Sequence, residues 1–205
     1  MSSARIHPTA VIEYGVEIGE DSAIWDSVHI RGPGTSIGSS VIIGEKTYIA
    51  YDVKIGNRVK INAFVYICAG VTIEDGVMIS AGTIFTNDRF PRATGTDLAE
   101  LLSSDEPEDM PRVRVGAGAT IGAGAIIGPG VEIGRFAMIG MGTVVTRSVG
   151  DHMLVLGNPG RVAGLVCACG HPWTKDLPSE AVRGVCSNCG LTLDWSNGTC
   201  QVVST

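Results

Sequence analysis

The stretch IGNRVKINAFVYICAGVTIEDGVMIS, from Ile55 to Ser80, carries an isoleucine at every sixth position. A half-buried strand repeats every two residues and an amphipathic helix every 3.6, so neither period explains this pattern. The isoleucines stand at positions 55, 61, 67, 73 and 79. The sequence therefore contains an internal repeat of six residues.

The same phase runs through most of the chain. It continues back to Ile6, with one hexad lengthened by a residue in IRGPGTS, and it is lost at Phe85 and returns at Val115. The fifth place of each hexad holds a smaller residue, such as Val59 or Val65. One long and one short inward side chain per hexad suit the interior of a narrow prism.

The fourth place of the hexad favours glycine, aspartate or serine, which tolerate positive φ or close a turn at low cost. Each hexad is thus predicted to be a short strand that ends in a corner. Hexapeptide repeats are typical of β-helices, in which three hexads form one coil, and at about 4.8 Å per strand some six coils give a prism roughly 30 Å tall. The fourth-place residues include Gly15, Asp21, Ser27, Asp52, Gly70, Gly76, Gly82, Gly118, Gly124, Gly130 and Gly142.

The composition limits the classes of function. A chain of 205 residues with 28 glycines and 5% aromatic residues suits one thin, repetitive domain plus a small module. The net charge of −6 argues against nonspecific nucleic-acid binding. MSSARIHPTA lacks the apolar region of a secretory signal, and the uncharged run from Val115 to Val131 keeps the hexad phase instead of the composition of a membrane span. We expect a cytoplasmic protein that binds no membrane.

Two pairs of cysteines follow the repeats, in the pattern C-x-C-G…C-x2-C-G. Two close pairs of thiolates match the tetrahedral coordination of structural Zn²⁺, and the glycines permit tight turns. Four cysteine ligands would leave no open position, so such an ion would be structural. The predicted ligands are Cys167, Cys169, Cys186 and Cys189.

Alternatives for these cysteines remain open. A disulfide pair is disfavoured in a reducing cytosol, whereas reduced, metal-free cysteines are consistent with the C-x-C spacing of the first pair. His171 or Cys200 can also replace one ligand. We expect residues 1–160 to form the repeat domain and residues 161–205 to form a zinc-ribbon-like tail.

The hexad phase stops between Phe85 and Arg114, in FTNDRFPRATGTDLAELLSSDEPEDMPRVR. A long loop on a rigid scaffold more often carries function than decoration. Phe85, Thr86 and Asn87, followed by the motif Pro91-Arg92-Ala93, resemble the loop of bacterial N-acetyltransferases that acylate nucleotide-linked 3-amino sugars. IWDSVHI, GVTIEDGV and LGNPGRVAGLVCACG are similar to other segments of that branch.

This resemblance covers nearly the whole chain, and it implies a fold and an activity. The implied fold is all-β, a left-handed parallel β-helix with one long extruded loop. The implied activity is an N-acyltransferase reaction from acetyl-CoA to the amino group of a UDP- or dTDP-linked amino sugar, carried out by a homotrimer. Asp88-Arg89-Phe90 before the proline and Gly160 after Asn-Pro depart from the branch pattern, which leaves the sugar and the nucleotide undefined.

The loop contains no histidine to act as a general base, although many hexapeptide acyltransferases use one. The amide of Asn87 can orient the attacking nitrogen or donate to the developing oxyanion, and a 3-amino group has a neutral fraction that binds directly. We therefore predict catalysis mainly by positioning. Asp88 is a competing candidate base, and a turn-capping carboxylate is the alternative interpretation.

Arginines are the candidates for binding anionic ligands. Arg31 and Arg92 can pair with a nucleotide diphosphate, Arg89 is a further substrate-binding candidate in the loop, and His29 can hydrogen-bond the sugar, base or phosphate. Solvated surface arginines are the alternative. For acetyl-CoA, the candidates are the corner residues Gly122 and Gly140 and the phosphate-binding residues Arg147 and Arg161.

Other functions of the same fold stay open at this point. They are an O-acetyltransferase, an acetyltransferase acting on an antibiotic or another small amine, and a noncatalytic scaffold. A β-helical carbonic anhydrase is disfavoured, because it needs three histidines around zinc and the regular coils contain only His29.

Overall fold

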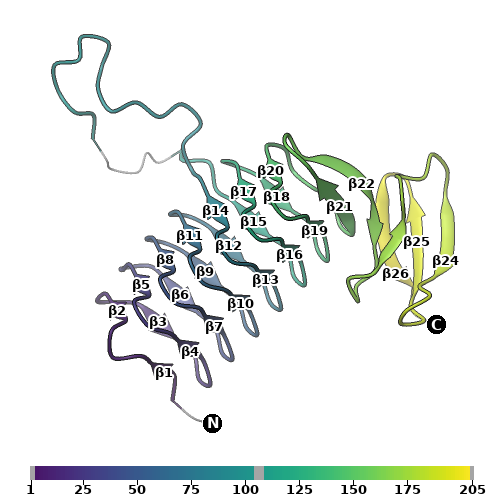
Figure 1. Cartoon of the computed structure of the whole chain (residues 1–205), viewed down its shortest axis with the longest axis horizontal. Coiled ribbons are helices and arrows are strands. Elements are labelled where there is room, and N and C mark those ends of the chain that lie inside the picture. The colour runs from purple at the N-terminus through teal and green to yellow at the C-terminus, as the bar shows by residue number, and fades with distance from the viewer. Residues whose placement is uncertain (1–2, 104–108, 204–205) are drawn as a thin grey trace.

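The computed structural model describes residues 3–103 and 109–203, in which the regular elements are all β-strands. Figure 1 shows a solenoid of stacked coils, a loop that extends away from its side, and a small module at its C-terminal end. The solenoid strands pair in parallel, and each strand pairs with the equivalent strands of the coils above and below. The parallel β-solenoid predicted from the hexads is confirmed, and its left hand stays a prediction.

Three sheets form the faces of the prism. Sheet 1 contains β1 (Arg5–Ile6), β4 (Ala23–Ile24), β7 (Ile42–Ile43), β10 (Lys60–Ile61), β13 (Met78–Ile79), β16 (Thr120–Ile121) and β19 (Met138–Ile139). Sheet 2 contains β2 (Val11–Ile12), β5 (His29–Ile30), β8 (Tyr48–Ile49), β11 (Tyr66–Ile67), β14 (Ile84–Phe85), β17 (Ile126–Ile127) and β20 (Val144–Val145). Sheet 3 contains β3 (Glu17–Ile18), β6 (Ser36–Ile37), β9 (Lys54–Ile55), β12 (Thr72–Ile73), β15 (Arg114–Val115) and β18 (Glu132–Ile133). Sheet 2 has 7 strands, so the solenoid has one coil more than the six expected.

The core is a single column of aliphatic side chains inside the prism. Ile61 and Ile67 are fully buried, as are the short inward residues around them. Burying a side chain of this size stabilises the fold by about 1.5–3 kcal/mol. Ile6 in the first coil keeps 44% of its surface exposed, since no earlier coil of the described chain lies beneath it. Stacking therefore generates the core, and single hexads do not.

The fourth place of the hexad does adopt positive φ. All eleven glycines, aspartates and serines predicted there have φ between 50° and 80°. Residues of other types also adopt this conformation at the same place: Lys46 (56°), Arg58 (55°) and Phe64 (58°). Because the corner geometry repeats in every coil, the position determines φ even where the side chain disfavours it.

The loop leaves the solenoid without interrupting the stack. It runs from the end of β14 to the start of β15, as the loss of phase predicts. Ile84 pairs with Ile126 in the next coil, and Thr72 pairs with Arg114, so both sheets continue past the insertion. The loop is an addition to one corner of a continuous prism.

The tail is joined to the solenoid by hydrogen-bonded strands. β21 (Met153–Leu156) extends sheet 1 in parallel with β19, and β22 (Arg161–Val166) and β23 (Pro172–Thr174) follow antiparallel. A separate antiparallel sheet contains β24 (Val182–Val185), β25 (Thr192–Ser196) and β26 (Thr199–Val203). The predicted domain boundary at 160/161 falls between β21 and β22. The described residues contain no helix able to cross a membrane.

Candidate functional site

The root of the loop lies at the corner between sheets 2 and 3. Asn87 leaves this corner half-buried, and its Nδ2 lies 3.1 Å from Sδ of Met110, which returns from the loop. Met110 is 9% exposed and packs on Ala50 and Ala69 of the two coils below. Two residues further on, Arg112 Nη1 donates to Asp52 Oδ2 at 2.7 Å. Both ends of the loop are thus fixed to the solenoid.

Asp88 is exposed and engaged by its own loop. Its Oδ1 accepts a hydrogen bond of 2.7 Å from the backbone N–H of Phe90. This is the turn-capping contact that we gave as the alternative to a general base. The carboxylate retains a second oxygen for another partner.

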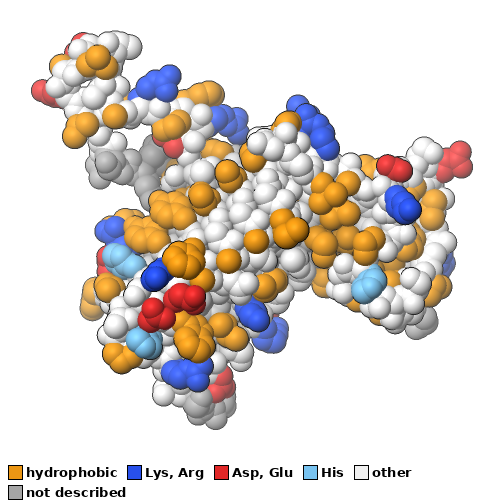
Figure 2. Space-filling view, viewed as in Figure 1, with side chains coloured by type: hydrophobic (Ala, Val, Ile, Leu, Met, Phe, Trp, Pro, Cys, Tyr) orange, Lys and Arg blue, Asp and Glu red, His pale blue; other side chains and the backbone are white. Residues whose placement is uncertain are grey.

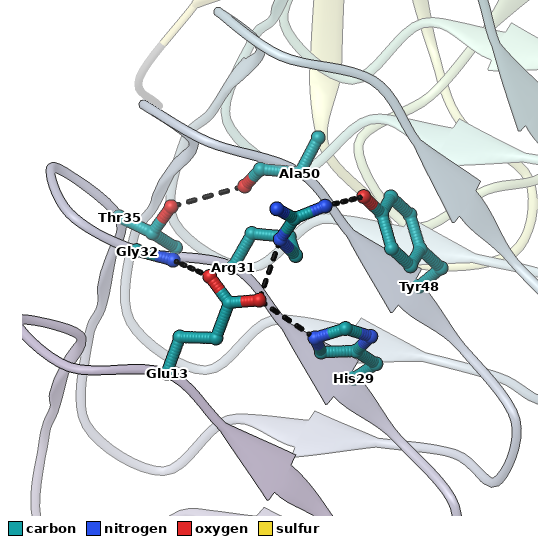
Figure 3. A network of polar contacts seen from close by, with 7 residues as sticks. All are labelled: Glu13, His29, Arg31, Gly32, Thr35, Tyr48 and Ala50. Atoms are coloured by element: carbon teal, nitrogen blue, oxygen red, sulfur yellow. Dashed lines mark hydrogen bonds and ion pairs between the residues drawn. The ribbon is translucent and has the colours of Figure 1, made fainter.

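A polar network lies on the same side of the prism, in the lower coils of sheet 2 (Figure 3). Glu13 Oε1 lies 3.0 Å from His29 Nε2 and 2.6 Å from Arg31 Nε, and Glu13 Oε2 accepts from the Gly32 N–H at 3.2 Å. Arg31 Nη1 donates to the Tyr48 hydroxyl at 3.0 Å. The contact between Arg31 Nε and Glu13 is an ion pair whose N–H is not aligned for a hydrogen bond. We call Glu13, His29, Arg31 and Tyr48 the lower polar network.

The network fixes the charge states of its members. Burial raises the pKa of Glu13, but the contacts from Gly32, His29 and Arg31 outweigh it and hold that pKa below its ordinary value. The hydrogen bond to Tyr48 and the ion pair with Glu13 raise the pKa of Arg31. The ion pair therefore persists across neutral pH.

Arg31 is only partly available to a ligand. Its Nε faces Glu13, its Nη1 is bonded to Tyr48, and its guanidinium lies 4.2 Å from the centroid of the Tyr51 ring. Among these contacts, Nη2 is the nitrogen without a protein partner. In the described structure, Nη2 is thus the guanidinium nitrogen left to pair with a phosphate. The contacts of Nε and Nη1 fix its orientation.

The lower polar network and Asn87 lie along one corner at a defined spacing. His29 pairs with Tyr48, Tyr48 with Tyr66, and Tyr66 with Ile84, three residues before Asn87. Three strand spacings place His29 roughly 14 Å below the loop root. Between them, the rings of Tyr48 and Tyr66 stack with centroids 5.3 Å apart and planes at 6°. As expected from the sequence, this separation is too long for proton transfer.

The two loop arginines are both exposed and lie apart from this network. A Cβ built on Gly130, at the same corner of a higher coil, would come within 4.0 Å of Arg89 Nη2. Arg92 Nη1 donates to the carbonyl of Pro91 at 2.9 Å. Arg89 thus points along the corner, and Arg92 stays on the loop.

The residues predicted to bind CoA fall into two groups. Arg147 and Arg161 line one pocket of about 160 Å³ at the C-terminal end of the solenoid, together with Thr146 and Ser148. Gly122 and Gly140 lie at a different corner, between sheets 1 and 2. A Cβ on Gly122 would approach Met141 N to 2.6 Å. The close stacking of the coils therefore explains this glycine without any role in CoA binding.

The four predicted metal ligands converge. The sulfur atoms of Cys167, Cys169, Cys186 and Cys189 all lie within 4.8 Å of one another, whereas Cys200 is buried elsewhere in the tail core. The closest pairs are Cys167 with Cys189 at 3.5 Å and Cys169 with Cys186 at 3.7 Å. A tetrahedral Zn²⁺ with bonds of about 2.3 Å requires sulfur separations of about 3.8 Å. The cluster therefore has the size of a metal site.

Backbone N–H groups point at these sulfurs. The N–H of His171 lowers the pKa of Cys169 to about 6, with help from the Asn188 side chain. The N–H groups of Cys189 and Asn188 lower the pKa of Cys186. Burial raises the pKa of Cys167. The N–H of Leu191 lowers the pKa of Cys189, but burial and the Cys169 and Cys186 thiols outweigh it and raise that pKa. The backbone donors thus favour the thiolate, the form that binds metal, at Cys169 and Cys186.

Sequence reasoning missed Glu13 and Met110. Glu13 stands eighteen residues before Arg31, one full coil, so opposite charges at that spacing would have predicted the ion pair. The register of β2 with β5 places these two residues one above the other. No comparable signal points to Met110, because the loop carries no repeat.

Comparison with known proteins agrees with this architecture. Residues 52–87 and 112–147 match the family described as bacterial transferase hexapeptide (six repeats). Over 92 residues the chain is 39% identical to the dTDP-3-amino-3,6-dideoxy-α-D-galactopyranose 3-N-acetyltransferase of Aneurinibacillus thermoaerophilus. That match covers 45% of each chain, so it spans about half the length of the curated relative.

The chain is also similar, at low identity, to two solved bacterial structures with bound CoA. PerB from Caulobacter crescentus, bound to CoA and GDP-perosamine, is 24% identical with a TM-score of 0.46, covering 80% of this chain and 58% of PerB. A variant of AntD, an N-acyltransferase from Bacillus cereus bound to dTDP and CoA, is 22% identical with a TM-score of 0.48, covering 81% and 84%. The family match itself covers residues 52–87 and 112–147, which include strands of all three sheets of the solenoid.

Proposed function

We propose that this protein is an acyl-CoA-dependent N-acyltransferase that acetylates the amino group of a nucleotide-linked 3-amino sugar. The observation that carries the proposal is the loop root: Asn87 stands where the loop leaves the prism, in a chain 39% identical over 92 residues to a dTDP-3-amino-sugar N-acetyltransferase. The lower polar network on the same corner supports it, because it offers polar groups to the rest of a long ligand.

The reaction needs little acid–base help from the protein. The neutral amine attacks the thioester carbonyl carbon, a C–N bond forms, the C–S bond breaks, and the sulfur leaves as the CoA thiolate. The nitrogen loses one proton to solvent or to the thiolate. Asn87 holds the nitrogen and carbonyl in line, an effect that contributes about 7–11 kcal/mol when the geometry is good.

The remaining residues bind the two substrates. Nη2 of Arg31 and the ring of His29 contact the nucleotide sugar from below, and Arg89 and Arg92 approach it from the loop. Arg147 and Arg161, which share a pocket, bind phosphates of acetyl-CoA. This arrangement separates the two anionic ligands along the prism.

The tail holds one structural Zn²⁺ through Cys167, Cys169, Cys186 and Cys189. The sulfur separations of 3.5 and 3.7 Å and the N–H groups around them fit a tetrahedral thiolate site. When bound, the ion supplies a cross-link between two parts of the tail, and it takes no part in acyl transfer.

The protein assembles as a homotrimer through sheet 2. Outward apolar side chains follow one another up this sheet, including Tyr66 (45% exposed), Ile84 (41%) and Ile126 (38%). Figure 2 shows hydrophobic side chains along the solenoid, with charged groups gathered near its N-terminal coils. A continuous exposed stripe of this kind favours burial against further copies of the chain.

A thiol-release assay tests the activity. The purified protein is incubated with acetyl-CoA and a panel of UDP- and dTDP-linked 3-amino sugars, and free CoA thiol is measured together with the mass of the sugar. We expect release that depends on a free amino group and a mass gain of one acetyl. The N-acetylated sugars serve as controls and release nothing. If no amino sugar supports release above hydrolysis, the proposed function is wrong.

A further inference from the structure

In the described part of the loop, its two ends contact each other through the side chains of Asn87 and Met110. Asn87 and Met110 are 23 residues apart in sequence, yet the amide nitrogen of one lies 3.1 Å from the sulfur of the other. A thioether sulfur is a weak acceptor and has no proton to donate. The contact therefore uses an N–H of Asn87 and leaves its carbonyl Oδ1 for another partner.

Met110 is held in a notch made by small residues. Ala50 is 7% exposed and Ala69 is 4% exposed, and both pack on Met110 together with the half-buried Tyr48. A Cβ built on Gly70 would lie 2.8 Å from Met110 Cε, so a larger residue at that corner would push the end of the Met110 side chain aside. The notch and the side chain are matched in size.

The shape of methionine suits this notch. Its unbranched chain reaches past the corner, and its polarizable sulfur contacts both apolar and polar neighbours. The ion pair between Arg112 and Asp52 anchors the backbone two residues further on, which fixes the direction from which Met110 enters. The sulfur therefore has a defined position relative to Asn87.

We propose that Met110 is a positioning residue that holds the Asn87 amide with its N–H on sulfur and its Oδ1 toward the substrate. In this orientation Oδ1 accepts one N–H of the sugar's amino group, so the nitrogen lone pair faces the thioester carbonyl. The inference rests on the proposed function and assigns Met110 a role through Asn87 alone. Without the sulfur, the amide rotates and presents either edge.

The test is a double-mutant cycle with Asn87. Met110→Leu keeps the apolar volume but removes the acceptor, and we expect kcat to fall about tenfold with KM within twofold of the parent. In an Asn87→Ala background the same change should alter kcat less than twofold, since no amide remains to be oriented. Met110→Gln, unbranched and with an acceptor oxygen, should recover most of the parent kcat.

Met78→Leu is the matched control, because it makes the same substitution at a half-buried methionine of β13 on sheet 1, away from the loop root and Asn87. Its effect on kcat should be the same in the parent and in the Asn87→Ala background. Equal losses for Met110→Leu in both backgrounds, or an unchanged kcat with Asn87 present, would overturn the inference. If the parent turns over but Asn87→Ala keeps its rate, the role of Asn87 and this inference fail while the proposed function stands.

A readout that does not depend on turnover completes the test. A crystal structure of Met110→Leu should show the Asn87 amide turned away from its place in the parent, or in two orientations. An Asn87 side chain that keeps one unchanged orientation contradicts the inference, even if no substrate is acetylated.

Discussion

Asp88 stands next to Asn87, and its carboxylate already has a backbone partner. Oδ1 accepts the Phe90 N–H at 2.7 Å, a bond that an asparagine side chain can also accept. Asp88→Asn should therefore retain activity within about threefold, whereas Asp88→Ala should lose more, because the turn at the start of the loop is released. The measurement is kcat for acetyl transfer. A loss of two orders of magnitude in Asp88→Asn would identify Asp88 as the general base instead.

Glu13 gives the lower polar network a dependence on pH. Its pKa is held below its ordinary value of 4.5, so its contribution to stability is complete above about pH 4.5 and is lost as the pH falls through the lower, folded-state pKa. The melting temperature of Glu13→Gln should lie below that of the parent at neutral pH. The two curves should converge in acid. A difference that stays constant from pH 7 down to acid would contradict the assignment.

At the scale of the single strand, isoleucines in the same hexad place contribute different amounts to the free energy of unfolding, depending on the coil in which they lie. Ile67 is fully buried between two coils, and Ile6 is 44% exposed in the first coil. Ile67→Ala should lower the free energy of unfolding by about 2–5 kcal/mol, because it leaves a cavity in the column. Ile6→Ala should cost well under half of that. Urea denaturation measures both, and equal losses would mean that the column is not the core.

The strands were largely predictable from the sequence, and the corners less so. Two-residue strands need only one inward isoleucine every sixth place, and the hexads supply it. Glycine, aspartate and serine marked the positive-φ places correctly. Lys46, Arg58 and Phe64 gave no such signal, because at those places the stacked neighbours impose the conformation and the side chain only tolerates it.

At the scale of the whole molecule, the proposed assembly through the outward face of sheet 2 can be tested with one substitution. Tyr66→Glu puts a charge in the middle of the apolar stripe and should shift the protein toward monomers. Thr72→Glu is the control. Thr72 lies in the same coil on sheet 3 and pairs with Lys54 and Arg114, whose positive charges attract a carboxylate. Light scattering after size exclusion should give three chains for the parent and the control. A trimeric Tyr66→Glu protein would place the interface elsewhere.

The proposed Zn²⁺ site of the tail can be tested by metal analysis. Protein purified without added zinc should carry about one equivalent, and less than half an equivalent would count against the site. Chelation should shift tryptophan emission to longer wavelength, because Trp195 is buried against Cys167 and Cys186. Cys186→Ser should lose the ion. Cys200→Ser, in the same core but outside the four-sulfur cluster, should keep it.

The candidate site was predictable only where it lies on the repeat. His29, Arg31 and Asn87 could be placed along one corner by counting coils, and Glu13 could have been found in the same way. The contacts of Met110 and Arg112 could not, because the returning end of the loop is positioned by packing on Ala50, Ala69 and Asp52 and not by any period. The four cysteines converge as the two closely spaced pairs in the sequence predicted.

The unbroken stack of paired strands beneath the loop gives the prism a fixed unit of length, one strand spacing per coil. The span from Arg31 to Asn87 equals a whole number of strand spacings, so it can lengthen or shorten only by about 4.8 Å at a time, through gain or loss of an entire turn of chain. A ligand that contacts both positions must therefore match a length that changes only in steps of one coil. Point substitutions change the affinity of the contacts at each end of the ligand, whereas the distance between Arg31 and Asn87 changes only with the number of coils.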